Sequence, residues 1–222
     1  MMIRTYLLSL IATLTLMMVT AVEADAFPER ERGWIPGFIG GVNNATVNHV
    51  PNGLSADPLI GFSAGMTLER HLAPEFVFRP QVTYNQKGFV VDDEIVDENN
   101  GETEVYDFSY RSEYIETFYP IIYSFELHSE FVPQVFLGPT LSFGIDGELD
   151  IDEMPEEMEE MFEEEPGLFD FGATVGIGGI QHFRNFALTI DLRYNWGFLD
   201  TGIHDEDSIR NQGASLNLGF RF

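Results

Sequence analysis

Apolar and polar residues alternate with a period of two along most of this chain. The last nine residues show the pattern most clearly, because every second position is apolar and the positions between them are Ser, Asn, Gly and Arg. Alternation of this kind places one set of side chains on each face of a β-strand. Those apolar positions are Ala214, Leu216, Leu218, Phe220 and Phe222.

The same alternation recurs in segments that are long for a soluble protein. Strands of soluble proteins usually contain about 5–6 residues, whereas a tilted membrane-spanning strand needs about 9–11. Residues 105–115 could form a strand of their own, but we interpret them as the early part of a long fourth strand. The pattern therefore predicts eight strands. They are residues 37–46, 59–70, 76–91, 105–125, 132–146, 169–181, 186–199 and 214–222.

The connections between these strands alternate between short and long. The short ones are residues 71–75, 126–131 and 182–185, and the long ones are residues 47–58, 92–104, 147–168 and 200–213. Outer-membrane barrels have short periplasmic turns and longer outer loops. We therefore predict an all-β fold, an eight-stranded antiparallel up-and-down transmembrane β-barrel. A soluble lipocalin-like barrel would need a mainly polar exterior, but the apolar face here includes Tyr194, Trp196 and Phe198.

The N-terminus has the features of a secretory signal peptide. Arg4 precedes an apolar run over residues 7–19, and small residues follow it. Cleavage after Ala26 fits an A-x-A site, with Ala24 as a second option. The run has about 13 residues, fewer than the roughly 20 of a membrane-spanning helix. We predict a cleaved signal peptide at 1–26, a short N-terminal segment at 27–36 and a barrel domain at 37–222.

The formal net charge of −26 excludes nucleic acid as a partner, since a phosphate backbone requires a basic surface. The absence of cysteine excludes disulfides and thiolate metal sites. Much of the charge lies in the predicted outer loop at 146–168, where residues 146–165 contain 12 acidic residues and no basic one. Met154, Met158, Met161 and Phe162 follow helical spacing within this loop.

The acidic loop allows three interpretations. It is a solvated loop, a site for divalent cations, or a surface for a basic protein. Asp146, Asp150 and Asp152 are close enough in sequence to share a calcium ion, although the segment does not match an EF-hand loop. These three residues are the metal-ligand candidates.

The predicted barrel interior contains charges of both signs. An eight-stranded barrel is just wide enough for its side chains to fill it, and buried charges need partners. We therefore predict an internal network of ion pairs and hydrogen bonds rather than a catalytic or ligand site. Its members are Glu69, Arg79, Lys87, Glu116, Asp170, Asp191, Arg193 and Arg221.

No catalytic residue and no cofactor site is predicted. None of the five histidines lies in a nucleophile motif or has the spacing of a metal-ligand pair. The protein is therefore expected not to be an enzyme.

Several stretches resemble the PorT-like outer-membrane β-barrel family of the Bacteroidetes group. They are residues 37–43 (GFIGGVN), 76–88 (FVFRPQVTYNQKG), 135–139 (VFLGP), 192–197 (LRYNWG) and 218–222 (LGFRF). The P-Q-x-x-Y-x-Q-K-G portion is the most specific, and the likeness spans nearly the whole mature chain. It implies an eight-stranded outer-membrane barrel. The family's namesake acts in secretion and gliding, but this chain departs from the family by its acidic third loop.

The terminal Phe222 closes an amphipathic strand, which is similar to the signal that the barrel-insertion machinery reads. The alternative is a chance terminal aromatic residue. Outer-membrane lipid and this machinery are thus the expected partners, together with divalent cations or a basic protein at the acidic loops.

Three functions remain open from the sequence. The leading hypothesis is a non-enzymatic barrel with a structural or binding role, whose outer loops contact ions, lipopolysaccharide or another protein. The alternatives are a component of a secretion or envelope assembly, and a small pore or transporter. The bulky inward residues Arg79, Phe118 and Arg221 argue against the pore.

Overall fold

The computed structural model describes residues 33–48, 55–96, 103–125, 130–153, 169–199 and 210–222. These residues contain ten β-segments and no helix long and apolar enough to cross a membrane. The segments are β1 (Ile35–Val47), β2 (Asp57–His71), β3 (Phe76–Phe78), β4 (Gln81–Val96), β5 (Thr103–Phe118), β6 (Ile121–Ser124), β7 (Phe131–Glu153), β8 (Asp170–His182), β9 (Ala187–Gly197) and β10 (Asn211–Arg221).

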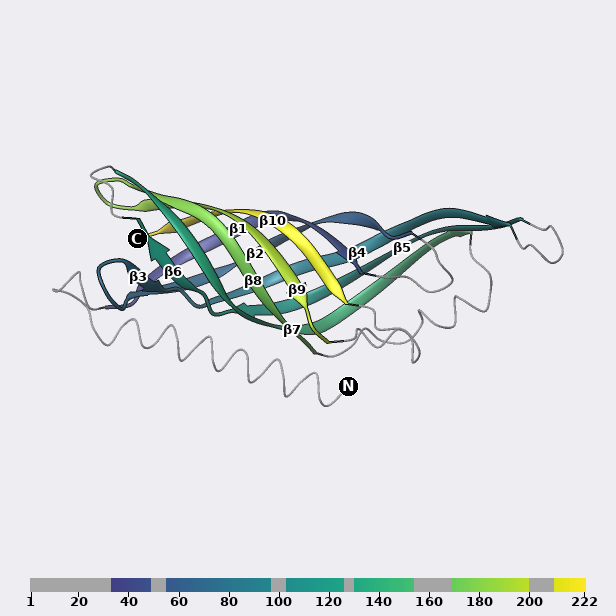
Figure 1. The fold of residues 1–222 in the computed structure, drawn as a ribbon, viewed down its shortest axis with the longest axis horizontal. Helices are drawn as coiled ribbons and strands as arrows, with labels where there is room; N and C mark the ends of the chain where they lie inside the picture. Colours follow the sequence, from purple (N-terminus) through teal and green to yellow (C-terminus); the bar gives the residue numbers. More distant parts are fainter. Residues whose placement is uncertain (1–32, 49–54, 97–102, 126–129, 154–168, 200–209) are drawn as a thin grey trace.

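The strands form one closed antiparallel sheet. Strand β1 pairs with both β2 and β10, and β7 pairs with β8 on one side and with β5 and β6 on the other. Strand β2 pairs with both β3 and β4. Segment β3 pairs in turn with β6, and β4 pairs with β5. We name each full-length strand of the barrel wall a stave. Segments β3 and β4 together make one stave, as do β5 and β6, so the described residues form eight staves. Figure 1 shows their arrangement around the barrel. The predicted fold class, an all-β antiparallel up-and-down barrel, is confirmed.

Two staves that the sequence pattern predicted as continuous strands, residues 76–91 and 105–125, are each interrupted at a proline. Pro80 lies in the break between β3 and β4, and Pro120 lies in the break between β5 and β6. Proline lacks the N–H that a ladder requires and is found at bulges and strand edges. The breaks are adjacent, because the backbone N–H of Arg79 donates to the carbonyl of Pro120 at 3.3 Å.

Three strands extend further than the sequence predicted. The prediction assigned residues 92–104 and 147–168 to loops, but β4 and β5 stay paired as far as Val96 opposite Thr103, and β7 pairs with β5 as far as Glu153. In Figure 1 these strands run far beyond the others, away from the C-terminus. Acidic residues were interpreted as a loop signal, yet the interleaved Val, Ile, Tyr and Phe residues favour strands.

Other boundaries differ by a few residues. Strand β1 begins at Ile35, inside the predicted N-terminal segment, and β10 begins at Asn211 rather than at Ala214. The predicted signal peptide and the predicted helical spacing at residues 154–162 lie outside the described residues. We name the end with the connections at 72–75 and 183–186 the turn end, and the opposite end the loop end.

Side chains follow the alternation that the sequence predicts, with apolar groups outside and polar groups inside. On β9, Leu188, Ile190 and Leu192 are exposed by 42–51%, whereas the intervening Thr189 and Asp191 are buried. A soluble protein would expose the polar set instead. The outside of this barrel therefore suits an apolar solvent.

Aromatic residues gather on the outside at two levels. At the turn end, the Phe186 and Phe220 rings stack with centroids 5.3 Å apart. Toward the loop end, Tyr194 and Trp196 are in contact at 4.4 Å. The ten residue steps from Phe186 to Trp196, at about 3.3 Å each and tilted by about 40°, span about 25 Å, which is the height of the apolar band of a membrane barrel.

Candidate functional site

The structure places all eight predicted network residues inside the barrel. They come from β2, β4, β5, β8, β9 and β10 and from the break between β3 and β4. Seven of them take part in ion pairs, and Asp170 instead accepts a hydrogen bond from Asn211 Nδ2 at 3.4 Å. The pairs lie at three levels along the barrel axis, which we name the turn-end pair, the central triad and the loop-end pair.

The central triad joins Arg79, Asp191 and Arg193. Asp191 Oδ2 accepts hydrogen bonds from Arg79 Nη2 at 2.9 Å and from Arg193 Nη2 at 2.8 Å. Asp191 is fully buried, and the guanidinium of Arg193 also lies over the rings of Phe118 and Phe136, at 5.2 and 5.6 Å from their centroids. Two cations thus share one buried carboxylate, so loss of that carboxylate would leave both charges without compensation.

The loop-end pair consists of Lys87 and Glu116, with Ser142 completing the group. Lys87 Nζ lies 2.6 Å from Glu116 Oε2, and the Ser142 hydroxyl donates to the same oxygen at 3.0 Å. Lys87 Nζ also donates to Ser142 Oγ at 3.3 Å. A serine beside a lysine can form a nucleophile and its base, but a lysine paired with a carboxylate is a charged donor and not a base. This arrangement is therefore structural.

The turn-end pair consists of Glu69 and Arg221, which are directly hydrogen bonded. His71 Nε2 lies 3.4 Å from the same carboxylate oxygen of Glu69. An apolar cluster of Val77, Phe118, Ile122 and Phe136 fills another part of the barrel, and the Arg193 guanidinium lies over two of its rings. Its members come from the two interrupted staves and from β7, so the proline breaks help to close the turn end.

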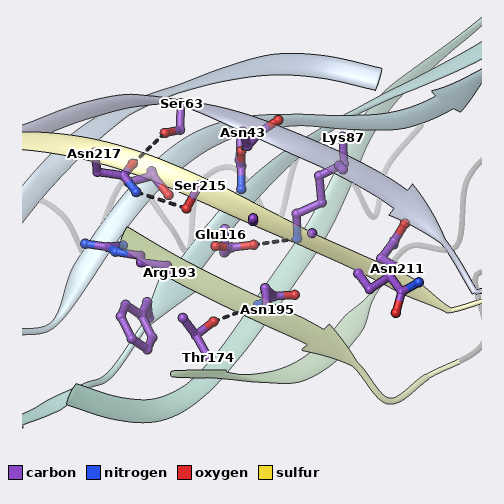
Figure 2. A pocket seen from close by; sticks show the side chains of 17 residues that line it. Asn43, Ser63, Lys87, Glu116, Thr174, Arg193, Asn195, Asn211, Ser215 and Asn217 are labelled. Carbon is purple, nitrogen blue, oxygen red and sulfur yellow. Dashed lines mark hydrogen bonds and ion pairs between the residues drawn. The ribbon is translucent and has the colours of Figure 1, made fainter. Parts of the chain in front are cut away.

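A layer of uncharged polar side chains lies between the triad and the loop-end pair. Asn43 Nδ2 donates to Asn85 Oδ1 at 2.5 Å, and Asn195 Nδ2 donates to Thr174 Oγ1 at 2.8 Å. Figure 2 shows Asn43 and Asn195 around one cavity together with Lys87, Glu116 and Arg193, and Asn85 also lines this cavity. The sequence pattern did not distinguish them as site residues, because inward asparagine and threonine residues show no charge pattern. Their only signal was their place on the polar face of a strand.

The cavities inside the barrel are small. The one bordered by the amide layer has a volume of about 50 Å³, and a second one near the turn end has about 10 Å³. Sites for small organic ligands usually occupy about 300–1,000 Å³. Arg193 borders the larger cavity and Arg79 the smaller, so the central triad separates the two. These two cavities have room for water molecules but not for an organic substrate.

The metal-ligand candidates are only partly described. Asp146 is exposed, and its Oδ1 accepts a hydrogen bond from the backbone N–H of Gly147 at 3.0 Å. The side chains of Asp150 and Asp152 lie outside the described residues. Within the part of the chain that is described, no group of three His, Cys, Asp or Glu residues is arranged to hold a metal ion.

The C-terminal Phe222 packs on the outside at the turn end. Its ring lies 6.0 Å from Phe38 and 5.1 Å from Phe220. The terminal strand is therefore held by an aromatic cluster in the folded barrel. Its role as an insertion signal stays a prediction.

Residues 24–201 match the model of a protein family described as the outer membrane protein beta-barrel domain. No curated protein matches the chain. Similar solved structures include Neisserial surface protein A, with 16% identity, a TM-score of 0.46, and coverage of 84% of this chain and 97% of that one. Ail of Yersinia pestis has 12% identity and a TM-score of 0.41, covering 85% and 99%. OprG of Pseudomonas aeruginosa has 8% identity and a TM-score of 0.43, covering 85% and 94%.

Proposed function

Because this chain belongs to the outer membrane protein beta-barrel domain family and lies in the outer membrane, we propose that it is a non-enzymatic barrel that binds a positively charged partner at its outer surface. The observation that carries the proposal is the paired extension of β4, β5 and β7 beyond the rest of the barrel. From Tyr84, β4 continues for twelve residues to Val96. A paired sheet holds the backbone of its acidic residues in register, unlike a solvated loop.

Acidic residues face one another across this extension. Asp92 on β4 lies directly opposite Asp107 on β5, and Asp107 lies opposite Glu153 on β7. Glu113 on β5 is likewise opposite Asp146 on β7. Like charges opposite one another destabilise a sheet, so a bound cationic group would relieve the repulsion. The surrounding negative field would also speed the approach of such a partner.

A basic protein segment suits this surface better than a single divalent cation. The acidic positions are distributed along three strands, whereas a metal ion needs several oxygen ligands at one point. Polylysine is therefore a suitable probe for the protein in lipid nanodiscs. We expect binding at low salt that weakens as the ionic strength rises, because exposed charges are screened.

The double substitution Asp92→Asn with Asp107→Asn should weaken polylysine binding by about two- to thirtyfold, since the two exposed charge contacts contribute about 0.2–1 kcal/mol each. Isothermal titration calorimetry measures the change. The matched control is Glu75→Gln with Glu130→Gln, which removes two charges at the turn end and should leave the affinity unchanged. Equal losses in the two variants would mean that only the net charge matters, and the proposal would fail.

A small pore is an alternative function, and the packing of the barrel interior bears on it directly. The central triad lies between two cavities of about 50 and 10 Å³, and the apolar cluster fills the turn end beside it. We expect no steady conductance when the purified barrel is inserted into a planar bilayer. A stable open level in the unmodified protein would favour the pore over the binding role.

A component of a secretion or envelope assembly is the role that the PorT-like resemblance implies. That resemblance rests on short stretches, of which residues 76–88 are the most specific. Within this stretch the structure gives Arg79, Gln81 and Lys87 positions inside the barrel, where they bond to other interior residues. These residues serve the packing of the barrel, so we place the binding role first.

A further inference from the structure

Two buried polar atoms near the turn end have no hydrogen-bond partner. They are Glu69 Oε2 and Arg79 Nε, on side chains that are exposed by only 1% and 3%. Each side chain also has an engaged polar atom, since Glu69 Oε1 bonds to Arg221 and Arg79 Nη2 bonds to Asp191. A buried donor or acceptor without a partner costs about 1–3 kcal/mol, and more when it is charged. Both atoms therefore need a ligand.

Both side chains border the same small cavity. It has a volume of about 10 Å³, and Thr67, Thr189 and Arg221 also line it. A cavity of this size holds one water molecule when two to four polar partners surround it. The two orphaned atoms are complementary, because Arg79 Nε donates a hydrogen bond and Glu69 Oε2 accepts one.

The charges around the cavity select a neutral ligand. The Glu69 carboxylate repels an anion, and the guanidinium groups of Arg79 and Arg221 repel a cation. A water molecule accepts from one side and donates to the other, so it satisfies both atoms at once.

We propose that this cavity binds a single water molecule that bridges Arg79 Nε and Glu69 Oε2. The bridge joins the turn-end pair to the central triad, which are otherwise separate groups of ion pairs. The resulting network runs from β10 and β2 through the break after β3 to β9. The proline breaks place Arg79 where it reaches both groups, so the water completes a polar layer across the barrel.

The bound water can be detected by NMR of the refolded protein in detergent micelles. The side-chain Nε–H of Arg79 should give a resolved signal with a nuclear Overhauser cross-peak to a long-lived water, and Arg79→Lys assigns the signal by removing it. Thr189→Ile should displace the water, because the longer side chain extends into the cavity while every ion pair remains. The expected result is loss of the cross-peak with the Arg79 signal retained.

The control is Glu116→Gln, which alters the loop-end pair and should leave the cross-peak intact. Glu69→Met provides a second test, since it removes the acceptor and should abolish the cross-peak. An Arg79 Nε–H signal without a water cross-peak in the unmodified protein would overturn the proposal. Persistence of the cross-peak in Thr189→Ile would do so as well, because the water would then lie elsewhere.

Discussion

Replacing Asp191 by asparagine is expected to lower the free energy of unfolding by about 3–5 kcal/mol. Asparagine has the same shape as aspartate but carries no charge. In the unmodified protein, one carboxylate oxygen of Asp191 accepts hydrogen bonds from both Arg79 and Arg193. The substitution removes this negative charge and leaves the two arginines as neighbouring buried cations. Urea titration of the refolded barrel, followed by tryptophan fluorescence, measures the effect. With a slope of about 1–3 kcal/mol per molar urea, the midpoint should fall by roughly 2 M.

Two variants establish the cause of this loss. Glu75→Gln removes a charge from the turn that precedes β3, and its unfolding midpoint should stay near that of the unmodified protein. The triple substitution Asp191→Leu, Arg79→Met and Arg193→Met removes the whole triad and should recover much of the stability, because apolar residues of similar volume replace buried ion clusters well. An Asp191→Asn midpoint equal to that of Glu75→Gln would refute the role assigned to the triad.

Replacing Gly138 by alanine should destabilise the barrel by about 1–3 kcal/mol, and Gly138→Val should prevent folding. Gly138 on β7 faces the barrel interior beside the break at Tyr119 and Pro120. A Cβ atom there would lie 2.7 Å from Pro120 Cα and from the Tyr119 carbonyl carbon, and closer still to the Tyr119 oxygen. These are backbone atoms, so no side-chain rotation relieves the contact. Folding of the barrel is measured on a gel, as the difference in migration between boiled and unboiled samples.

Gly40→Ala is the matched control for this substitution. Gly40 lies on β1, and the nearest atom to an added Cβ there is the Ser63 carbonyl oxygen at 3.4 Å, an ordinary contact. Alanine is expected to be tolerated at this position. If Gly138→Ala were as stable as Gly40→Ala, the close approach of the Tyr119 and Pro120 backbone would not be the reason that position 138 requires glycine.

The period-two pattern predicted the strands well where it was strong, and less well at prolines and acidic runs. The strands at residues 59–70 and 169–181 agree with β2 and β8 to within two residues at each end. The breaks at Pro80 and Pro120 were missed, because the residues on both sides of each proline still follow the alternation. The extensions of β4, β5 and β7 were missed because acidic residues resemble loops. Their backbones are nevertheless paired, without a break between β4 and β5 and with two register shifts between β5 and β7.

The alternation of apolar and polar residues also predicted only part of the candidate site. Alternation was sufficient to select Glu69, Arg79 and Asp191 as inward residues, since a side chain's face depends only on its position along the strand. It could not identify their bonding partners. The amide layer around Asn43 and Asn195 was missed because neutral polar residues leave no charge pattern to follow.

The sequence by itself determined the membrane-type barrel class and the inward face of each strand, because both follow from a repeat of two residues along the chain. The tertiary structure decided which charges meet. Arg79 and Asp191 are 112 residues apart and come together because the staves are tilted and the sheet closes. The levels of the ion pairs depend on the registers of all eight staves together, and no local pattern contains that information. The proposed water site near the turn end also depends on the tertiary structure. The break at Arg79 and Pro80 places the Arg79 side chain beside the same cavity as Glu69 of β2 and Arg221 of β10.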